Sequence, residues 1–137
     1  MPRILAIDYG TKRVGLAVTD SLQIIATGLT TVHSNEVIAF LKSYTAKEEV
    51  ETFVLGMPTN LDNSPTDATP HVIGFERKLK KEFPNIPIHL VDERYTSKMA
   101  HAAMLQGGLK KKARQKKETV DMVAATIILQ SFMSGNE

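Results

Sequence analysis

The chain has 137 residues, 42% of them hydrophobic and 23% charged, with a formal net charge of +2; this balance is typical of one globular domain over residues 1–137. The absence of cysteine excludes disulfides and thiolate metal sites, and it favours a reducing, cytoplasmic setting. No apolar run approaches the roughly 20 residues that a membrane helix needs, so we expect no membrane association.

The periodicity of the apolar residues predicts five strands, at residues 3–8, 14–20, 24–32, 51–56 and 88–91. A turn over Gly10–Arg13 is expected to pair the first two strands as a hairpin. Four helices are expected to begin at Ser34 as a cap, at Thr69 with Pro70 in the first helical position, at Thr96 or Ser97, and near Val120. The resulting order, βββαβαβαα, indicates an α/β fold. Its five-stranded mixed sheet would have three antiparallel strands first, parallel strands after them, and helices on its flanks.

Three acidic residues lie at the ends of these predicted elements. Asp8 ends the first strand, Glu93 follows the fifth strand, and Asp121 lies in the first turn of the last helix. An acid at the edge of buried structure is costly unless its charge is offset. Three carboxylates that converged there would form a site for a hard divalent cation such as Mg²⁺, which commonly acts on phosphates.

Each acid also has an ordinary structural explanation. Asp8 precedes a glycine turn whose backbone N–H groups could approach a phosphate, but aspartate and glycine are common in any hairpin turn. Glu93 and its neighbour Asp92 would point to opposite faces of a regular strand, and Glu93 with Arg94 could be a solvated ion pair. Asp121 would gain ~0.3–1 kcal/mol from the helix dipole. It also borders a predicted core stripe formed by Val120, Val123, Ala124, Ile127 and Ile128.

A basic run precedes the last helix. It carries six positive charges, on Lys110, Lys111, Lys112, Arg114, Lys116 and Lys117. A solvated loop is the default interpretation of such a run, but its position just before Asp121 favours contact with a polyanion near the acids. Together with Gly10, Thr11, Lys12, Arg13 and Arg94, these residues are the candidate substrate-binding set.

Four segments together resemble the YqgF family, which is similar to RNase H and RuvC-type resolvases. These segments are Ile7–Gly15, Leu55–Pro58, Asp92–Ser97 and Val120–Ala125, the last continued by Ile128–Gln130. The resemblance implies an RNase H-like fold, with Asp8, Glu93 and Asp121 as catalytic acids and as ligands of Mg²⁺ or Mn²⁺, two ions being expected. The chain departs from the expected pattern at Asn63, where a glycine would follow the aspartate; asparagine tolerates positive φ, so the turn can survive.

Our leading hypothesis is a two-metal-ion endonuclease that hydrolyses phosphodiester bonds and processes the 5′ end of precursor 16S rRNA. Its partner would be nucleic acid, with precursor rRNA favoured over branched DNA, and ribosomal particles are a further candidate partner. The same site would serve a Holliday junction resolvase. A resolvase must cut two strands symmetrically, which favours a homodimer, whereas a monomer suffices for a single RNA cut.

Two hypotheses from other classes remain open. The Asp-x-Gly-Thr turn also resembles the phosphate loop of the actin and sugar-kinase superfamily, but those proteins use two such domains and this chain has one copy of the motif. A non-catalytic nucleic-acid-binding protein is the other alternative, and the presence of all three acids argues against it.

Overall fold

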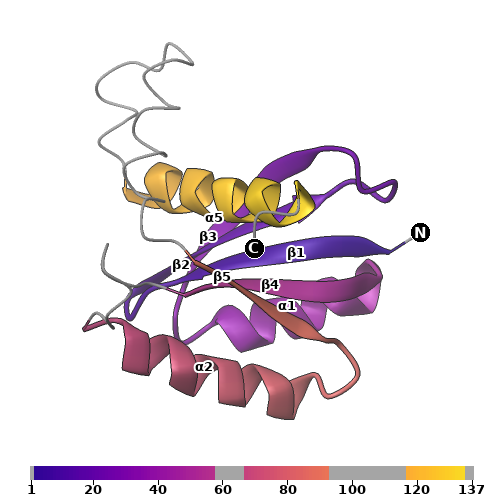
Figure 1. The fold of residues 1–137 in the computed structure, drawn as a ribbon. Coiled ribbons are helices and arrows are strands. Elements are labelled where there is room, and N and C mark those ends of the chain that lie inside the picture. Colours follow the sequence, from indigo (N-terminus) through magenta and orange to yellow (C-terminus); the bar gives the residue numbers. More distant parts are fainter. Residues whose placement is uncertain (1, 58–66, 93–116, 135–137) are drawn as a thin grey trace.

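A computed structural model describes residues 2–57, 67–92 and 117–134 of the chain (Figure 1). The described strands are β1 (Arg3–Tyr9), β2 (Arg13–Thr19), β3 (Ala26–His33), β4 (Val50–Met57) and β5 (Ile88–Asp92). The described helices are α1 (Val37–Lys47), α2 (Thr69–Glu82) and α5 (Lys117–Met133). None of these helices is long and apolar enough to cross a membrane.

The strands form one mixed sheet in the order β3-β2-β1-β4-β5. Strand β1 pairs antiparallel with β2, which pairs antiparallel with β3, whereas β1 with β4 and β4 with β5 are parallel pairs. This arrangement confirms the predicted sheet of three antiparallel strands followed by parallel ones. The predicted helix that begins at Thr96 or Ser97, and the turn around Asn63, lie outside the described residues.

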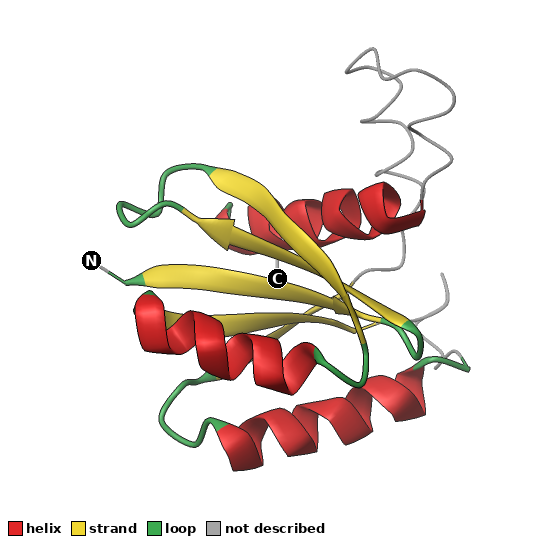
Figure 2. Cartoon of the chain, turned by 180° about the vertical axis from the view of Figure 1, so that it is seen from behind, coloured by secondary structure: helices red, strands yellow, loops and turns green. Residues whose placement is uncertain are grey.

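The helices cover the two faces of the sheet unequally. Helices α1 and α2 pack on one face and α5 crosses the other (Figures 1 and 2). Strand β1 alternates between these faces, because Leu5 and Ile7 belong to the hydrophobic cluster that contains α1 and α2 residues, while Ile4 and Ala6 belong to the cluster that contains α5 residues. By the same alternation Asp8 faces α5, and Tyr9 faces α2.

Two element starts differ from the sequence-based expectation. Helix α1 begins at Val37, so Ser34 is not its cap; the Ser34 hydroxyl instead donates a hydrogen bond to the carbonyl of Thr11, 2.6 Å away, in the turn before β2. Helix α2 includes Thr69, so the cap position falls on Ala68 and Pro70 is the second helical residue. The first error arises because the Ser34 hydroxyl bonds to the turn before β2, and the second is a shift of one residue, within the usual uncertainty of a helix boundary.

The third strand begins two residues later than predicted. The carboxylate of Asp20 accepts hydrogen bonds from the backbone N–H groups of Ile24 and Ile25, at 2.7 and 2.8 Å. These bonds hold the two isoleucines in the loop between β2 and β3, where their side chains are 66% and 62% exposed. Their β-branched side chains suggested a strand, but the local hydrogen bonds that they donate to Asp20 overrode that propensity.

Candidate active site

Asp8 lies near the carboxyl end of the central strand β1, opposite Gly15 of β2. Residues that pair directly across an antiparallel ladder point to the same face of the sheet, so Asp8 and Gly15 both face α5. The chain then turns through Gly10, Thr11 and Lys12. A Cβ on Gly10 would lie 2.5 Å from the carbonyl oxygen of Arg13, so only glycine fits this tight turn.

Gly15 sets how closely α5 approaches the sheet. A Cβ built on Gly15 would lie 2.1 Å from the backbone oxygen of Asp121 and 3.0 Å from the Asp121 Cβ. The α5 backbone at Asp121 therefore packs directly on Gly15 of β2, the residue that pairs with Asp8 across the sheet. This contact brings residues from the two ends of the chain to one place.

Asp121 lies further along its helix than the sequence indicated. Helix α5 already includes Lys117, so Asp121 is not in the first turn and its proximity to the helix dipole explains less. The predicted core stripe was also partly wrong, because Val120, Val123 and Ile127 are only partly buried. Two residues of the stripe, Ala124 and Ile128, are buried as predicted, and so are Ala125 and Leu129, which the stripe did not include. Asp121 lies one turn before Ala125, and its side chain is 19% exposed.

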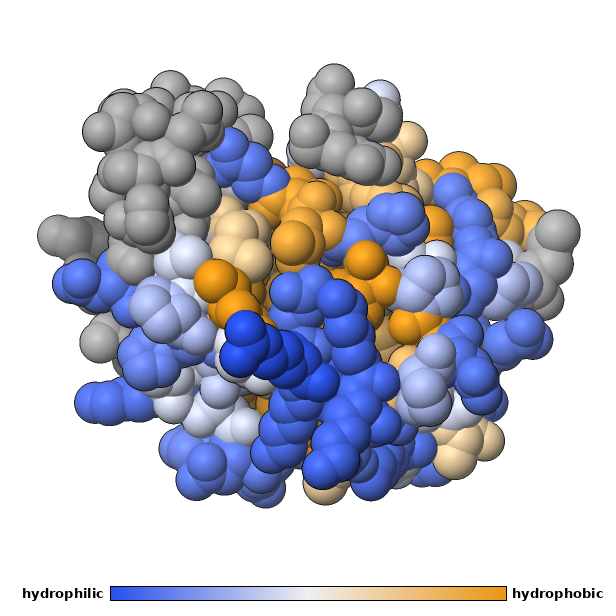
Figure 3. Space-filling view, turned by 60° about the horizontal axis from the view of Figure 1, so that its bottom comes forward, coloured by the Kyte–Doolittle hydropathy of each residue, from blue (hydrophilic) through white to orange (hydrophobic). Residues whose placement is uncertain are grey.

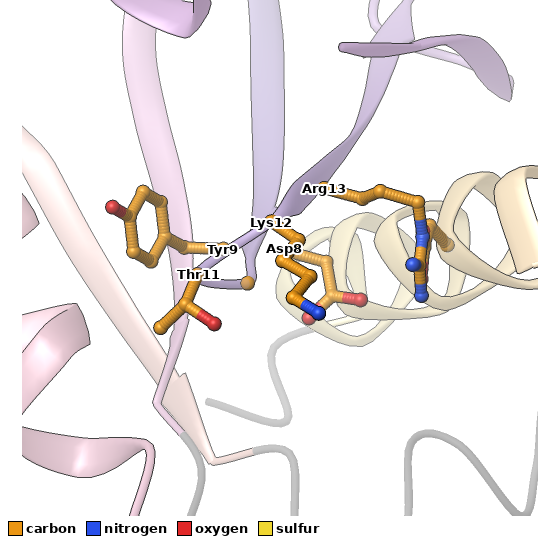
Figure 4. Close-up of a pocket in the computed structure, with 7 residues that line it drawn as sticks. Asp8, Tyr9, Thr11, Lys12 and Arg13 are labelled. Carbon is orange, nitrogen blue, oxygen red and sulfur yellow. The ribbon is translucent and has the colours of Figure 1, made fainter. Parts of the chain in front are cut away.

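Asp8 and Asp121 line one pocket of about 380 Å³ (Figure 4). The rest of its wall comes from the turn between β1 and β2. Its lining residues are Asp8, Tyr9, Gly10, Thr11, Lys12, Arg13 and Asp121. The turn residues predicted to bind substrate thus surround the two acids, within a polar hollow open to solvent.

Arg13 forms an ion pair with Asp121 inside this pocket. Its Nε donates a hydrogen bond to Asp121 Oδ2 at 2.8 Å, and its side chain is 36% exposed. Arg13 and Gly15 are two residues apart on β2 and so share the face toward α5. In Figure 4, Arg13 extends toward α5 while Tyr9 points the opposite way. The sequence suggested a phosphate contact for Arg13; the structure gives it a carboxylate partner.

The two described acids offer oxygen ligands of the kind that Mg²⁺ and Mn²⁺ prefer. The donor set at the pocket therefore fits a hard divalent cation, with Asp8 and Asp121 contributing. Within residues 2–57, 67–92 and 117–134, no group of three acidic or histidine side chains forms a metal cluster. Glu93, the third predicted acid, lies outside the described residues, as do Arg94 and the basic run through Lys116, and the Lys117 side chain.

Gly15 is the residue that sequence reasoning missed. It appeared only as part of a strand and of a family motif, without a role of its own. A signal was nevertheless present, since a glycine inside a strand weakens it and often marks a close backbone approach. The alternating pattern around Val14 and Leu16 identified the strand but not the helix that would lie on it.

The chain matches a known protein family over nearly its whole length. A family model described as "RuvX: Holliday junction resolvase" matches residues 2–135. A protein of Phocaeicola vulgatus is 51% identical over 100% of this chain and 99% of its own length. A protein of Amoebophilus asiaticus is 53% identical over 98% of this chain and 95% of its own length. Both carry the name "Putative pre-16S rRNA nuclease".

Solved structures show the same fold at low identity. RuvC of T. thermophilus in complex with a Holliday junction substrate matches with a TM-score of 0.59 at 16% identity, over 98% of this chain and 96% of that one. The fowlpox virus resolvase in complex with Holliday junction DNA matches with a TM-score of 0.62 at 12% identity, over 97% of each chain. These matches confirm the predicted RNase H-like fold.

Proposed function

Because this chain belongs to the RuvX family, the YqgF-type family that its motifs resemble, we propose that it is a metal-dependent nuclease that matures the 5′ end of precursor 16S rRNA. The observation that carries the proposal is that Asp8 and Asp121, 113 residues apart in the sequence, line one polar pocket. RNA is chosen as the substrate because relatives that are 51% and 53% identical to this chain share the name "Putative pre-16S rRNA nuclease".

In this proposal Asp8, Asp121 and Glu93 hold Mg²⁺ or Mn²⁺. A bound divalent cation supplies Lewis-acid stabilisation of the phosphate charge and lowers the pKa of a coordinated water. Asp8 enters the pocket from the central strand β1, and Asp121 enters it from α5. The Gly10–Lys12 turn provides backbone N–H groups and one cationic side chain beside the acids, where the scissile phosphate would lie.

Arg13 has a defined role in the same proposal: it is the counter-ion of Asp121 while the cation is absent. Two carboxylates in one pocket repel each other, and the guanidinium offsets that repulsion. A divalent cation must then compete with Arg13 for the Asp121 carboxylate. We expect Arg13→Gln to tighten Mn²⁺ binding about two- to fivefold, which corresponds to the ~0.4–1 kcal/mol of a partly exposed ion pair. Isothermal titration calorimetry without nucleic acid measures this change.

Lys12→Gln is the matched control for Arg13→Gln. It removes the same charge from the same pocket, but no ion pair joins Lys12 to Asp121 in the described structure. If Lys12→Gln gains less Mn²⁺ affinity than Arg13→Gln, the gain comes from breaking the ion pair with Asp121. Equal gains would come from the loss of any positive charge in the pocket. Weaker Mn²⁺ binding by Arg13→Gln would contradict the counter-ion role and show instead that Arg13 orients the carboxylate for the metal.

A direct comparison of substrates tests the function. Purified protein with Mg²⁺ or Mn²⁺ should cut a 5′-extended precursor 16S rRNA, presented free or in immature small-subunit particles, faster than it cuts a four-way DNA junction. The description of the matched family model favours one specific second candidate, a Holliday junction resolvase. Preferred, symmetric cutting of the junction by a dimeric form, with the dimer measured by sedimentation, would support that candidate and reject the rRNA assignment.

A further inference from the structure

A second pocket, of about 290 Å³, opens between α1 and α2. Its deepest residues are buried and apolar: Val37 is 1% exposed and Phe75 is 5% exposed. Its exposed wall is polar and includes His71 and Lys78 of α2. Figure 3 brings the face of α1 and α2 forward and shows a largely hydrophilic surface interrupted by apolar patches. Buried apolar side chains beside one lysine suit a ligand that has both a flat apolar part and a negative charge.

Tyr9 joins this second pocket to the candidate active site. It lines both pockets, and it follows Asp8 directly in the chain. Its ring stacks on Phe75 with centroids 4.3 Å apart and planes 18° apart. Asp8 and Tyr9 point to opposite sides of the sheet, so a polymer strand with a phosphate at Asp8 would reach the second pocket by passing around the end of β1, past Tyr9.

Gly74 keeps the second pocket open. It lies inside α2, where glycine costs about 1 kcal/mol relative to alanine. A Cβ at this position would meet no described atom within 4 Å, so neither close packing nor backbone conformation accounts for the glycine. The space that Gly74 leaves free belongs to the pocket it lines. Functional sites often keep residues that lower stability, and a glycine that leaves space for a ligand is such a residue.

We propose that the second pocket binds one nucleotide of single-stranded RNA next to the nucleotide that is cut, with the base over the apolar floor beside Tyr9 and with Lys78 on a phosphate. The inference rests on the proposed nuclease function and adds a subsite to it. Aromatic side chains stack bases of any sequence, and lysines contact the backbone, so this subsite would position the strand rather than read its sequence.

Filling the pocket tests the proposal, because it should move stability and RNA affinity in opposite directions. Gly74→Ala and Gly74→Leu should both raise the melting temperature, since each replaces a helical glycine at a position where an added Cβ meets no described atom within 4 Å. Binding of a short fluorescein-labelled single-stranded RNA, measured by anisotropy in an Asp8→Asn background that leaves the RNA uncut, should weaken about tenfold for Gly74→Leu, as expected for the loss of one stacked base. Gly74→Ala should weaken binding less.

Bulk and charge each have a control variant. Ala46→Leu adds a similar side chain at an exposed position of α1 outside the pocket and should leave RNA affinity unchanged. Lys78→Gln should reduce the salt dependence of binding by about 0.7, the value for one phosphate contact on a single strand. Lys81→Gln removes the same charge from an exposed position of the same helix outside the pocket and should not change the slope.

The outcomes separate this proposal from the function it rests on. Undiminished RNA affinity in Gly74→Leu overturns the base subsite, and equal salt slopes for the two lysine variants overturn the phosphate contact. If Gly74→Leu loses binding to a four-way DNA junction but keeps its RNA affinity, the pocket holds DNA and the assignment of RNA to it is overturned. If the Asp8→Asn protein with its native Gly74 binds no RNA at all, the proposed function fails together with the subsite.

Discussion

Asp8→Asn is expected to lower the cleavage rate at least about a hundredfold, because even groups that only orient a metal ligand are worth 10–100-fold. The stability of the folded protein should not fall. Asp8 shares its pocket with Asp121, and removing one of two like charges relieves repulsion when no cation is bound. The melting temperature in EDTA should therefore hold or rise, whereas the gain in melting temperature on adding Mn²⁺ should shrink, since ligand binding stabilises only through the affinity that remains.

Asp67→Asn is the matched control, since it makes the same chemical change at an exposed position that does not line the pocket. It should keep both the cleavage rate and the Mn²⁺-dependent rise in melting temperature. Cleavage by Asp8→Asn at the rate of the unaltered protein would reject Asp8 as a catalytic residue. A fall of its melting temperature in EDTA would instead reject the idea that the two carboxylates repel each other in the metal-free protein.

Gly15→Ala is the second change with a large expected effect. The added methyl would lie 2.1 Å from the backbone oxygen of Asp121, and a helix backbone cannot rotate away as a side chain can. Helix α5 must move, so the free energy of unfolding should fall by about 3 kcal/mol, the upper end for overpacking a well-packed contact. For a chain of this size that is a fall on the order of 10 °C in melting temperature, measurable by calorimetry. Mn²⁺ binding should weaken as well, because Asp121 is displaced from Asp8.

Gly28→Ala provides the comparison, because Gly28 lies on β3 and faces the same helix, α5. A Cβ on Gly28 would lie 3.4 Å from the Met122 Cβ, an ordinary van der Waals distance, so we expect a change of less than about 1 kcal/mol in the free energy of unfolding. Equal destabilisation by the two variants would mean that glycine matters for the strands in general. A much larger loss for Gly15→Ala, with weakened Mn²⁺ binding, would tie the effect to the seating of Asp121.

The sheet and most of its strands could be predicted from the sequence, and so could the meeting of Asp8 with Asp121. Strand alternation and turn chemistry are local, since they depend on the steric preferences of neighbouring residues, and so they could be interpreted without the fold. Alternation alone also implies that Asp8 and Tyr9 face opposite sides of the sheet. Where local rules failed, as at Ser34 and Ile24, a hydrogen bond to another part of the chain or to a nearby carboxylate outweighed propensity.

The rotation of α5 about its axis and the partner of Asp121 could be seen only in the folded chain. The helix is apolar on more than one side, so its sequence could not specify which stripe meets the sheet. That choice depends on where small residues let the two backbones approach, and Gly15 on β2 provides the place. The pairing of Arg13 with Asp121 follows from the same contact, across 108 residues of chain, as does the joining of Asp8 and Asp121 in one pocket. The pocket beside Tyr9 is likewise a property of two helix surfaces, because it depends on a volume that neither helix encloses alone.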